Sequence, residues 1–170
     1  FTHMFVQSPV CVSSRVSFFT GQYPHAHRNR VNYTPLSRSE VLMQARLKQA
    51  GYATASIGKL HYWPPTGLEA KRTGFDFVEL HDVVPSLDRF SDYARWRKEH
   101  DPQAKAFRYR ALAKNIEPGK NPFRAAIADQ FSDTRWVGKR TRHYLKLLVK
   151  ADKPFFLFSS FWKPHSPFET

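Results

Sequence analysis

Short apolar runs alternate along this chain with longer stretches whose apolar positions have the spacing of helices. Two of the runs predict β-strands. Residues 52–57 alternate between apolar and polar positions and end at Gly58, whereas residues 155–161 are almost continuously apolar. A continuous apolar run of this length is expected for a strand of a parallel sheet, because helices cover both faces of such a sheet.

Four segments have the capping residues or apolar spacing that predict helices, namely residues 15–20, residues 37 or 39 to 50, residues 87–100 and residues 132–149. Ser13 or Ser14 can cap the first of them, and Gly21 can end it in a left-handed conformation. Cys11 is therefore expected at or just before a helix N-terminus. Such a position favours negative charge and offers free backbone N–H groups.

The alternation of helices and strands predicts an open α/β sheet with chemistry at the carboxyl ends of its strands. Lys59 and His61 follow the first predicted strand, and Lys163 and His165 follow the second. Because parallel strands end at the same edge of a sheet, we expect both pairs to meet Cys11 there.

The extent of the chain predicts part of one domain. A length of 170 residues suits a single domain, but the first residue is not Met and the last residues follow directly on a predicted buried strand. We therefore expect residues 1–170 to be truncated at both ends. Residues 101–122 are polar, basic and interrupted by Pro and Gly, which predicts an insertion or excursion. No apolar run approaches the ~20 residues that span a bilayer.

The charge argues against a nucleic-acid-binding function, and the cysteine content excludes an internal disulfide. The net charge of +13 comes from scattered Lys and Arg without a nucleic-acid-binding motif, so we do not expect a nucleic-acid partner. A solvated basic surface and attraction of an anionic substrate remain as interpretations. The single cysteine excludes a disulfide within these residues.

Three clusters carry candidate chemistry, at residues 11–25, 51–61 and 163–168. In the first, Cys11 and Arg15 lie together at a helix start, which favours a thiolate and binds anions. A Cys–His hydrolase with any of the eight histidines as base is one interpretation. In the other clusters a Lys and a His two residues apart face the same side of an extended segment, and with Arg15 they could surround a tetrahedral anion. Each pair could equally be a solvated Lys beside a structural His.

The three clusters together resemble the signatures of the sulfatase family. The first is similar to the signature of Cys or Ser, any residue, Pro, any residue and Arg, followed by an apolar pair, Thr and Gly. The second is similar to the Gly-Tyr and Gly-Lys signature with its nearby His, and the third resembles the Pro-His-x-Pro-Phe loop. The resemblance implies an α/β alkaline-phosphatase-like sandwich with a mostly parallel central sheet, of which this chain is an incomplete N-terminal-half piece.

The resemblance also implies a covalent mechanism. Formylglycine-generating machinery would oxidise Cys11 to an aldehyde, whose hydrate ligates a divalent cation, calcium or alternatively magnesium. One hydroxyl of the hydrate attacks sulfur and expels the alcohol. Deprotonation of the other then eliminates sulfate. The substrate would be a sulfated small molecule or glycan.

The roles that the resemblance implies fall on five residues of this sequence. Arg15 steadies the nucleophile, and Lys59 binds both it and the sulfate oxygens. His61 is the base for elimination, while His165 binds sulfate and protonates the leaving oxygen. Lys163 is either a substrate contact or a solvated lysine.

The chain departs from the family pattern at Ser13, which stands where the signature has Pro and where the maturation machinery is thought to read the sequence. The remaining metal ligands are expected outside these residues, so the piece should be inactive alone. Two alternatives stay open: a phosphonate monoester hydrolase or phosphodiesterase of the same superfamily, and a non-catalytic anion-binding homologue with unmodified Cys11. The compartment is undetermined, with a periplasmic or secreted location favoured over the cytoplasm.

Overall fold

The computed structural model describes residues 2–82, 89–101 and 127–165. Its sheet has three parallel strands in the order β2-β1-β3, with bounds β1 (Ala53–Gly58), β2 (Phe77–Leu80) and β3 (Phe155–Ser160). The two predicted strands are confirmed within one residue at each end. The sequence did not predict β2, which pairs with the opposite edge of β1 from β3.

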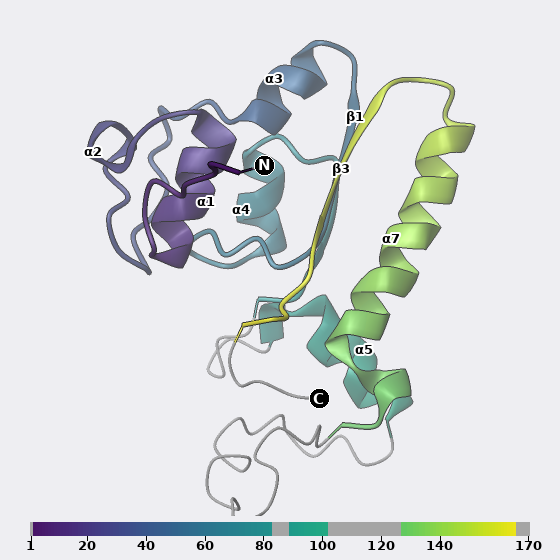
Figure 1. Cartoon of the computed structure of the whole chain (residues 1–170). Coiled ribbons are helices and arrows are strands. Elements are labelled where there is room, and N and C mark those ends of the chain that lie inside the picture. The colour runs from purple at the N-terminus through teal and green to yellow at the C-terminus, as the bar shows by residue number, and fades with distance from the viewer. Residues whose placement is uncertain (1, 83–88, 102–126, 166–170) are drawn as a thin grey trace, which may run out of the picture.

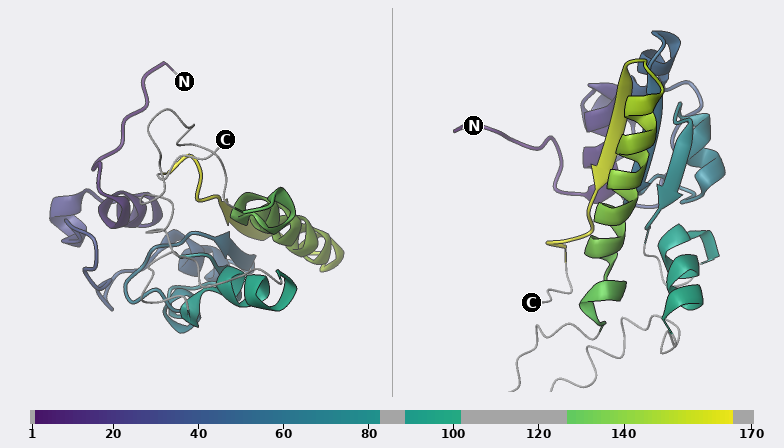
Figure 2. Two further views of the ribbon diagram at one scale, coloured as in Figure 1. Left: turned by 90° about the horizontal axis from the view of Figure 1, so that it is seen from below. Right: turned by 90° about the vertical axis from the view of Figure 1, so that its right-hand side faces the viewer.

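Helices cover both faces of the sheet (Figure 1). On one side lie α1 (Cys11–Thr20), α3 (Met43–Gln49) and α4 (Gly67–Arg72), with α2 (Pro24–His27) beside α1. On the other side lie α5 (Asp92–His100) and α7 (Asp133–Lys150), the latter preceded by the short η2 (Asp129–Phe131). This arrangement confirms the predicted α/β class. Figure 2 shows α7 running along β3, and the N-terminal segment leading away from the body of the protein before α1 begins.

The composition of β3 follows from these two layers. Phe156 and Phe158 pack against the larger core, which α1, α3 and α4 share with the sheet. Phe155 and Leu157 point to the opposite face and pack towards α7 and the alanines of β1. Each face of β3 thus meets apolar side chains, which explains the continuous run in the sequence. The strand is only half-buried along most of its length, whereas the central β1 is buried throughout.

The first helix begins earlier than its capping residues predicted. It starts at Cys11 with Val10 as N-cap, so the prediction of a start at Arg15 behind a serine cap was wrong. The free backbone N–H of the second helical residue is instead bound by a distant side chain, because the N–H of Val12 donates to Asn32 Oδ1 at 3.1 Å. Gly21 ends α1 at φ 69°, as predicted.

The other helices show where local signals succeed and fail. Ser37 and Ser39 hydrogen-bond to each other at 2.8 Å instead of capping α3, which begins only at Met43. The helix predicted at 132–149 is confirmed as α7, and Ser132 caps it by accepting from the N–H of Arg135. The expected helix at 87–100 is shorter, since α5 starts at Asp92, and the expected excursion at 101–122 lies outside the described residues except for its first position. Among the described residues, no helix is both long and apolar enough to cross a membrane.

Gly58 at the end of β1 directs the chain towards the carboxyl edge of the sheet. It has φ +94°, and a Cβ there would lie 2.0 Å from the backbone oxygen of Ser160. Only glycine permits this approach of β1 to β3. The next residue, Lys59, continues the ladder by donating its N–H to the same oxygen at 2.9 Å, which fixes its side chain at the junction of the two strands.

Candidate active site

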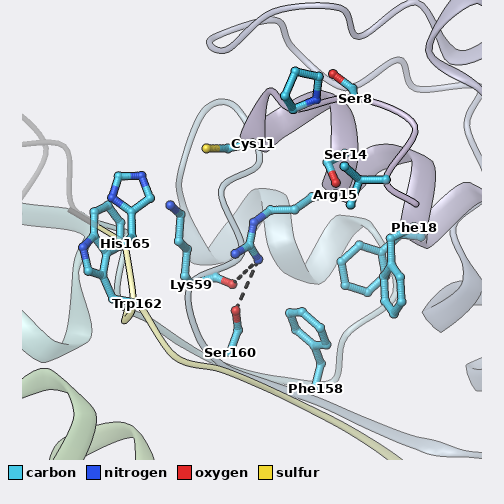
Figure 3. Close-up of a pocket in the computed structure, with 13 residues that line it drawn as sticks. Ser8, Cys11, Ser14, Arg15, Phe18, Lys59, Phe158, Ser160, Trp162 and His165 are labelled. Atoms are coloured by element: carbon cyan, nitrogen blue, oxygen red, sulfur yellow. Dashed lines mark hydrogen bonds between the residues drawn. The ribbon is translucent and has the colours of Figure 1, made fainter. Parts of the chain in front are cut away.

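The carboxyl ends of β1 and β3 and the start of α1 surround one pocket of about 460 Å³. Four of the predicted site residues line it, and Figure 3 shows the side chains of Cys11, Lys59 and His165 pointing into the same space. The other lining residues are mostly small or apolar: Val6, Ser8, Pro9, Ser14, Phe18, Phe19, Phe158, Ser160 and Trp162. The pocket therefore combines the cationic groups of Arg15 and Lys59 with an apolar wall.

Cys11 occupies the first residue of α1, and its side chain is partly exposed. The N-terminal turn of a helix carries partial positive charge and unpaired backbone N–H groups, so an anion bound beside Cys11 would be stabilised. Geometry thus places the lone thiol where an anionic group can reach it.

Arg15 connects α1 to both strands at the floor of the pocket. Its Nη1 donates to the backbone oxygen of Lys59 at 2.8 Å and to Ser160 Oγ at 3.2 Å (Figure 3). Burial lowers the pKa of Arg15, and the charges of Asp82 and Cys11 oppose that effect. Because the ordinary pKa of an arginine side chain is very high, the guanidinium stays charged and holds the two strand ends at a fixed distance from Cys11.

Lys59 is buried, with 3% of its surface exposed. Its Nζ lies 3.9 Å from the centroid of the Trp162 ring, a cation–π contact that offsets part of the loss of hydration. The same indole packs against His165, with 4.7 Å between ring centroids. Burial lowers the pKa of Lys59, as does the adjacent charge of Arg15. Trp162 thus holds the ammonium and one imidazole of the pocket together.

His61 is not among the residues that line the pocket. Its backbone has φ 59°, a left-handed conformation that costs a non-glycine residue roughly 1–2 kcal/mol. Burial lowers the pKa of His61 to about 4, with smaller contributions from the charges of Lys59, Arg15 and His165. The imidazole is therefore neutral near pH 7, as a proton acceptor must be, and the charges of Lys59 and Arg15 act on it.

Lys163 does not join the pocket lining. It is half-buried, and its charge contributes to lowering the pKa of Asp133. That carboxylate also accepts a hydrogen bond from the buried His81 at 3.1 Å. Within the described structure, the expected substrate contact of Lys163 therefore has no support from the geometry.

Three residues that sequence reasoning missed contribute to the site: Asp82, Ser160 and Trp162. All three lie at or within two residues of a strand end, where the rule that drew attention to Lys59 and His165 also applies. Asp82 escaped notice because β2 was not predicted. Ser160 lies within the apolar run at 155–161 and Trp162 directly follows it, so the pattern did not indicate a site role for either residue.

The described residues alone do not fit a divalent cation. No group of three His, Cys, Asp or Glu side chains gathers there in a way that could hold a metal. The charged neighbours of Cys11 in the pocket are an arginine and a lysine, and both repel a cation. The nearby Asp82 is buried and directs both oxygens to the N–H of His61. Ligands for a metal would have to come from outside these residues.

Ser13 supplies a stability prediction. Its side chain is fully buried, and its hydroxyl has no hydrogen-bond partner among the described residues. Because a buried unsatisfied hydroxyl costs free energy, Ser13→Ala should raise the free energy of unfolding by about 1 kcal/mol in urea denaturation of the full-length protein. Ser39→Ala, at an exposed position, should change it by less than about 0.5 kcal/mol. A destabilised Ser13→Ala variant would show that the hydroxyl is satisfied in the whole protein.

The fold and the pocket together define a class of protein: an α/β domain with a thiol and two cationic side chains at the carboxyl edge of a parallel sheet, suited to a tetrahedral oxyanion. The profile of the sulfatase family matches residues 1–170. The chain belongs to the sulfatase family, within the alkaline-phosphatase-like superfamily.

Similar proteins and structures support this family assignment. An arylsulfatase of Clostridium perfringens is 27% identical over 184 residues, covering 99% of this chain and 36% of that protein. A multifunctional alkaline phosphatase superfamily protein, PehA, of Trinickia caryophylli is 28% identical, and the match covers 93% of this chain and 32% of that protein. The structure of a phosphonate monoester hydrolase of Agrobacterium radiobacter superposes with a TM-score of 0.66 at 20% identity, and the match covers 98% of this chain and 34% of that structure. The chain thus spans about a third of the length of these relatives.

Proposed function

We propose that the protein containing this chain is a sulfuric ester hydrolase whose nucleophile is formylglycine made from Cys11. The observation that carries the proposal is the gathering of Cys11, Arg15, Lys59 and His165 around one pocket from three separate segments of the chain. A sulfate monoester presents a compact tetrahedral anion, and the pocket offers it two fixed cations and a helix N-terminus. Relatives described as sulfatases support the same reaction.

We assign each of these pocket residues a role from its position. Hydrated formylglycine supplies a hydroxyl nucleophile that a thiol cannot supply. Arg15 holds the first turn of α1 against the strand ends through its bonds to Lys59 and Ser160. Lys59, held against Trp162, neutralises the charge of the sulfate oxygens. Such preorganised charge is worth more in a buried site than in water, which is why Lys59 is kept from solvent.

The two histidines have different positions and therefore different proposed roles. His165 lines the open side of the pocket and is exposed, so it can donate a proton to the alcohol as it leaves. His61 is half-buried outside the pocket lining, and burial lowers its pKa. A neutral imidazole suits a base, and we assign to it the proton that must be removed when sulfate is eliminated from the enzyme.

The proposal extends to partners and context. Residues 1–170 would be part of a single sulfatase catalytic domain, inactive without the remainder. A divalent cation, calcium in our expectation, would be held by the modified Cys11 and by ligands elsewhere in the protein. The substrate would be a sulfated small molecule or glycan, the second partner the machinery that makes formylglycine, and the location periplasmic or secreted.

A phosphonate monoester hydrolase or phosphodiesterase is the second candidate, favoured by the likeness to PehA and by the fold of the Agrobacterium radiobacter enzyme. Sulfate, phosphate and phosphonate esters of one alcohol, assayed with the full-length protein, distinguish the candidates. We expect kcat/KM for the sulfate to exceed that for either phosphorus ester by ~10-fold or more, equivalent to 1.4 kcal/mol of transition-state binding. The reverse order would assign the protein to the phosphorus esters.

A further inference from the structure

Asp82 lies where β2 has just ended, beside the turn by which the chain leaves β1. The backbone N–H of its neighbour His81 donates to the oxygen of Gly58 at 3.0 Å, which extends the ladder between the two strands. One residue further, both carboxylate oxygens of Asp82 accept from the backbone N–H of His61 at 2.9 Å. Asp82 is 4% exposed, so water cannot replace this contact.

The hydrogen bonds to Asp82 hold the backbone of His61 in a conformation that is unfavourable for a residue with a side chain. His61 has φ 59°, in the left-handed region that side chains with a Cβ disfavour. Its N–H has no acceptor from the ladder, because β1 ends at Gly58. A carboxylate that holds this N–H fixes the direction in which the imidazole leaves the backbone, and that direction decides whether the ring can reach a proton in the pocket.

Asp82 also influences the cations of the site. Its charge raises the pKa values of Arg15 and Lys59 against the lowering caused by burial. Burial raises the pKa of Asp82 itself, and the His61 hydrogen bonds and the two cations oppose that rise. A buried carboxylate close to the half-buried Arg15 and the buried Lys59 reduces the cost of their desolvation. Through these effects Asp82 favours the charged forms of Arg15 and Lys59, and it needs no contact with substrate to do so.

We propose that Asp82 is a positioning residue that holds His61 in the orientation needed for elimination of sulfate from the enzyme. The proposal rests on the proposed function, since it takes His61 as the base of that step. Asp82 binds the backbone of His61 and is not among the residues that line the pocket.

The test uses the full-length, matured protein and an aryl sulfate. Asp82→Ala should produce a burst of phenol followed by a slow phase ~10²-fold below the wild-type rate, because misplacing a catalytic group by about 1 Å can cost that much. Asp82→Asn keeps one acceptor oxygen and should slow the second phase by only ~10-fold. If the aspartate acts through His61, adding Asp82→Ala to His61→Ala should slow the enzyme by less than about twofold further.

Asp76→Ala is the matched control. Asp76 accepts from the backbone N–H of Thr54 at 3.0 Å at the other end of β1, so its loss removes the same kind of bond away from the pocket. This variant should lower stability without producing a burst. Multiplicative effects in the double variant, or equal slowing of burst and steady state in Asp82→Ala, would overturn the proposal.

Hydrogen exchange of the His61 amide separates this proposal from the proposed function. Exchange should be slow in the wild type, much faster in Asp82→Ala and unchanged in Asp76→Ala, whether or not any sulfate ester is hydrolysed. Unchanged exchange in Asp82→Ala would overturn the positioning role even in an active sulfatase. Where Asp82→Ala does not fold, Asp82→Asn provides both measurements. Absence of hydrolysis in a folded, matured wild type, with the exchange pattern as expected, would refute the assigned reaction and leave only the anchoring of His61.

Discussion

Replacing Cys11 by alanine is expected to abolish hydrolysis of sulfate esters by the full-length, matured protein. Removal of a covalent nucleophile typically lowers kcat by ~10⁶-fold, because no other group can form the intermediate. The fold should survive, since Cys11 is partly exposed at the first residue of α1 and makes no disulfide. Steady-state turnover of an aryl sulfate measures the loss.

Thr20→Ala is the control for this substitution. Thr20 lies at the opposite end of the same helix, where its hydroxyl donates to the oxygen of Val16 at 2.7 Å. This variant should lower stability by ~1 kcal/mol and keep wild-type turnover. Substantial residual hydrolysis by Cys11→Ala, with the fold intact, would refute a covalent mechanism at this residue and favour direct attack by a metal-bound hydroxide.

The second large effect separates the two histidines. His165→Ala should slow the hydrolysis of an alkyl sulfate by ~10²–10⁴-fold, the usual contribution of a general acid. An activated aryl sulfate should be affected far less, because its alcohol leaves as a stable anion without protonation. A plot of rate against leaving-group pKa should therefore be much steeper for His165→Ala than for the wild type.

His61→Ala should behave differently, because it acts after the alcohol has left. Its loss should slow alkyl and aryl sulfates to a similar limiting rate and trap a sulfated enzyme. Rapid mixing should show a burst of alcohol followed by a slow phase. Equal dependence of both variants on leaving-group pKa, without a burst in either, would show that the two roles are wrongly assigned.

The sheet was more predictable than the helix starts. The strand at 155–161 was predictable because both of its faces meet apolar side chains, which leaves a continuous apolar run, and the strand at 52–57 was predictable from its alternation and from Gly58 at its end. The short β2 has an exposed first residue and a glutamate in its middle, and such a strand leaves little pattern. Serines that resemble helix caps misled the prediction of α1, where a side chain 20 residues further on binds the free N–H.

In the site, too, features set by local sequence could be predicted, whereas contacts between distant segments could not. Lys59 and His165 could be expected at one edge because parallel strands end together. The contact of Lys59 with the Trp162 ring, and the link from Arg15 to Ser160, join segments more than 100 residues apart. Sequence spacing alone does not determine which of two residues after a strand lines the pocket, so the pattern could not separate Lys163 from His165.

The most direct test of the proposed function is the mass of the peptide that carries Cys11, measured on the full-length protein from its native host. Conversion to formylglycine removes the elements of hydrogen sulfide and adds one oxygen atom, and the aldehyde is then reactive towards hydrazides. We predict the converted mass in the active protein, with Ser13 in place of the family proline. A peptide that carries an unmodified thiol, in protein that binds sulfate without hydrolysing its esters, would contradict the account and identify a non-catalytic anion-binding homologue.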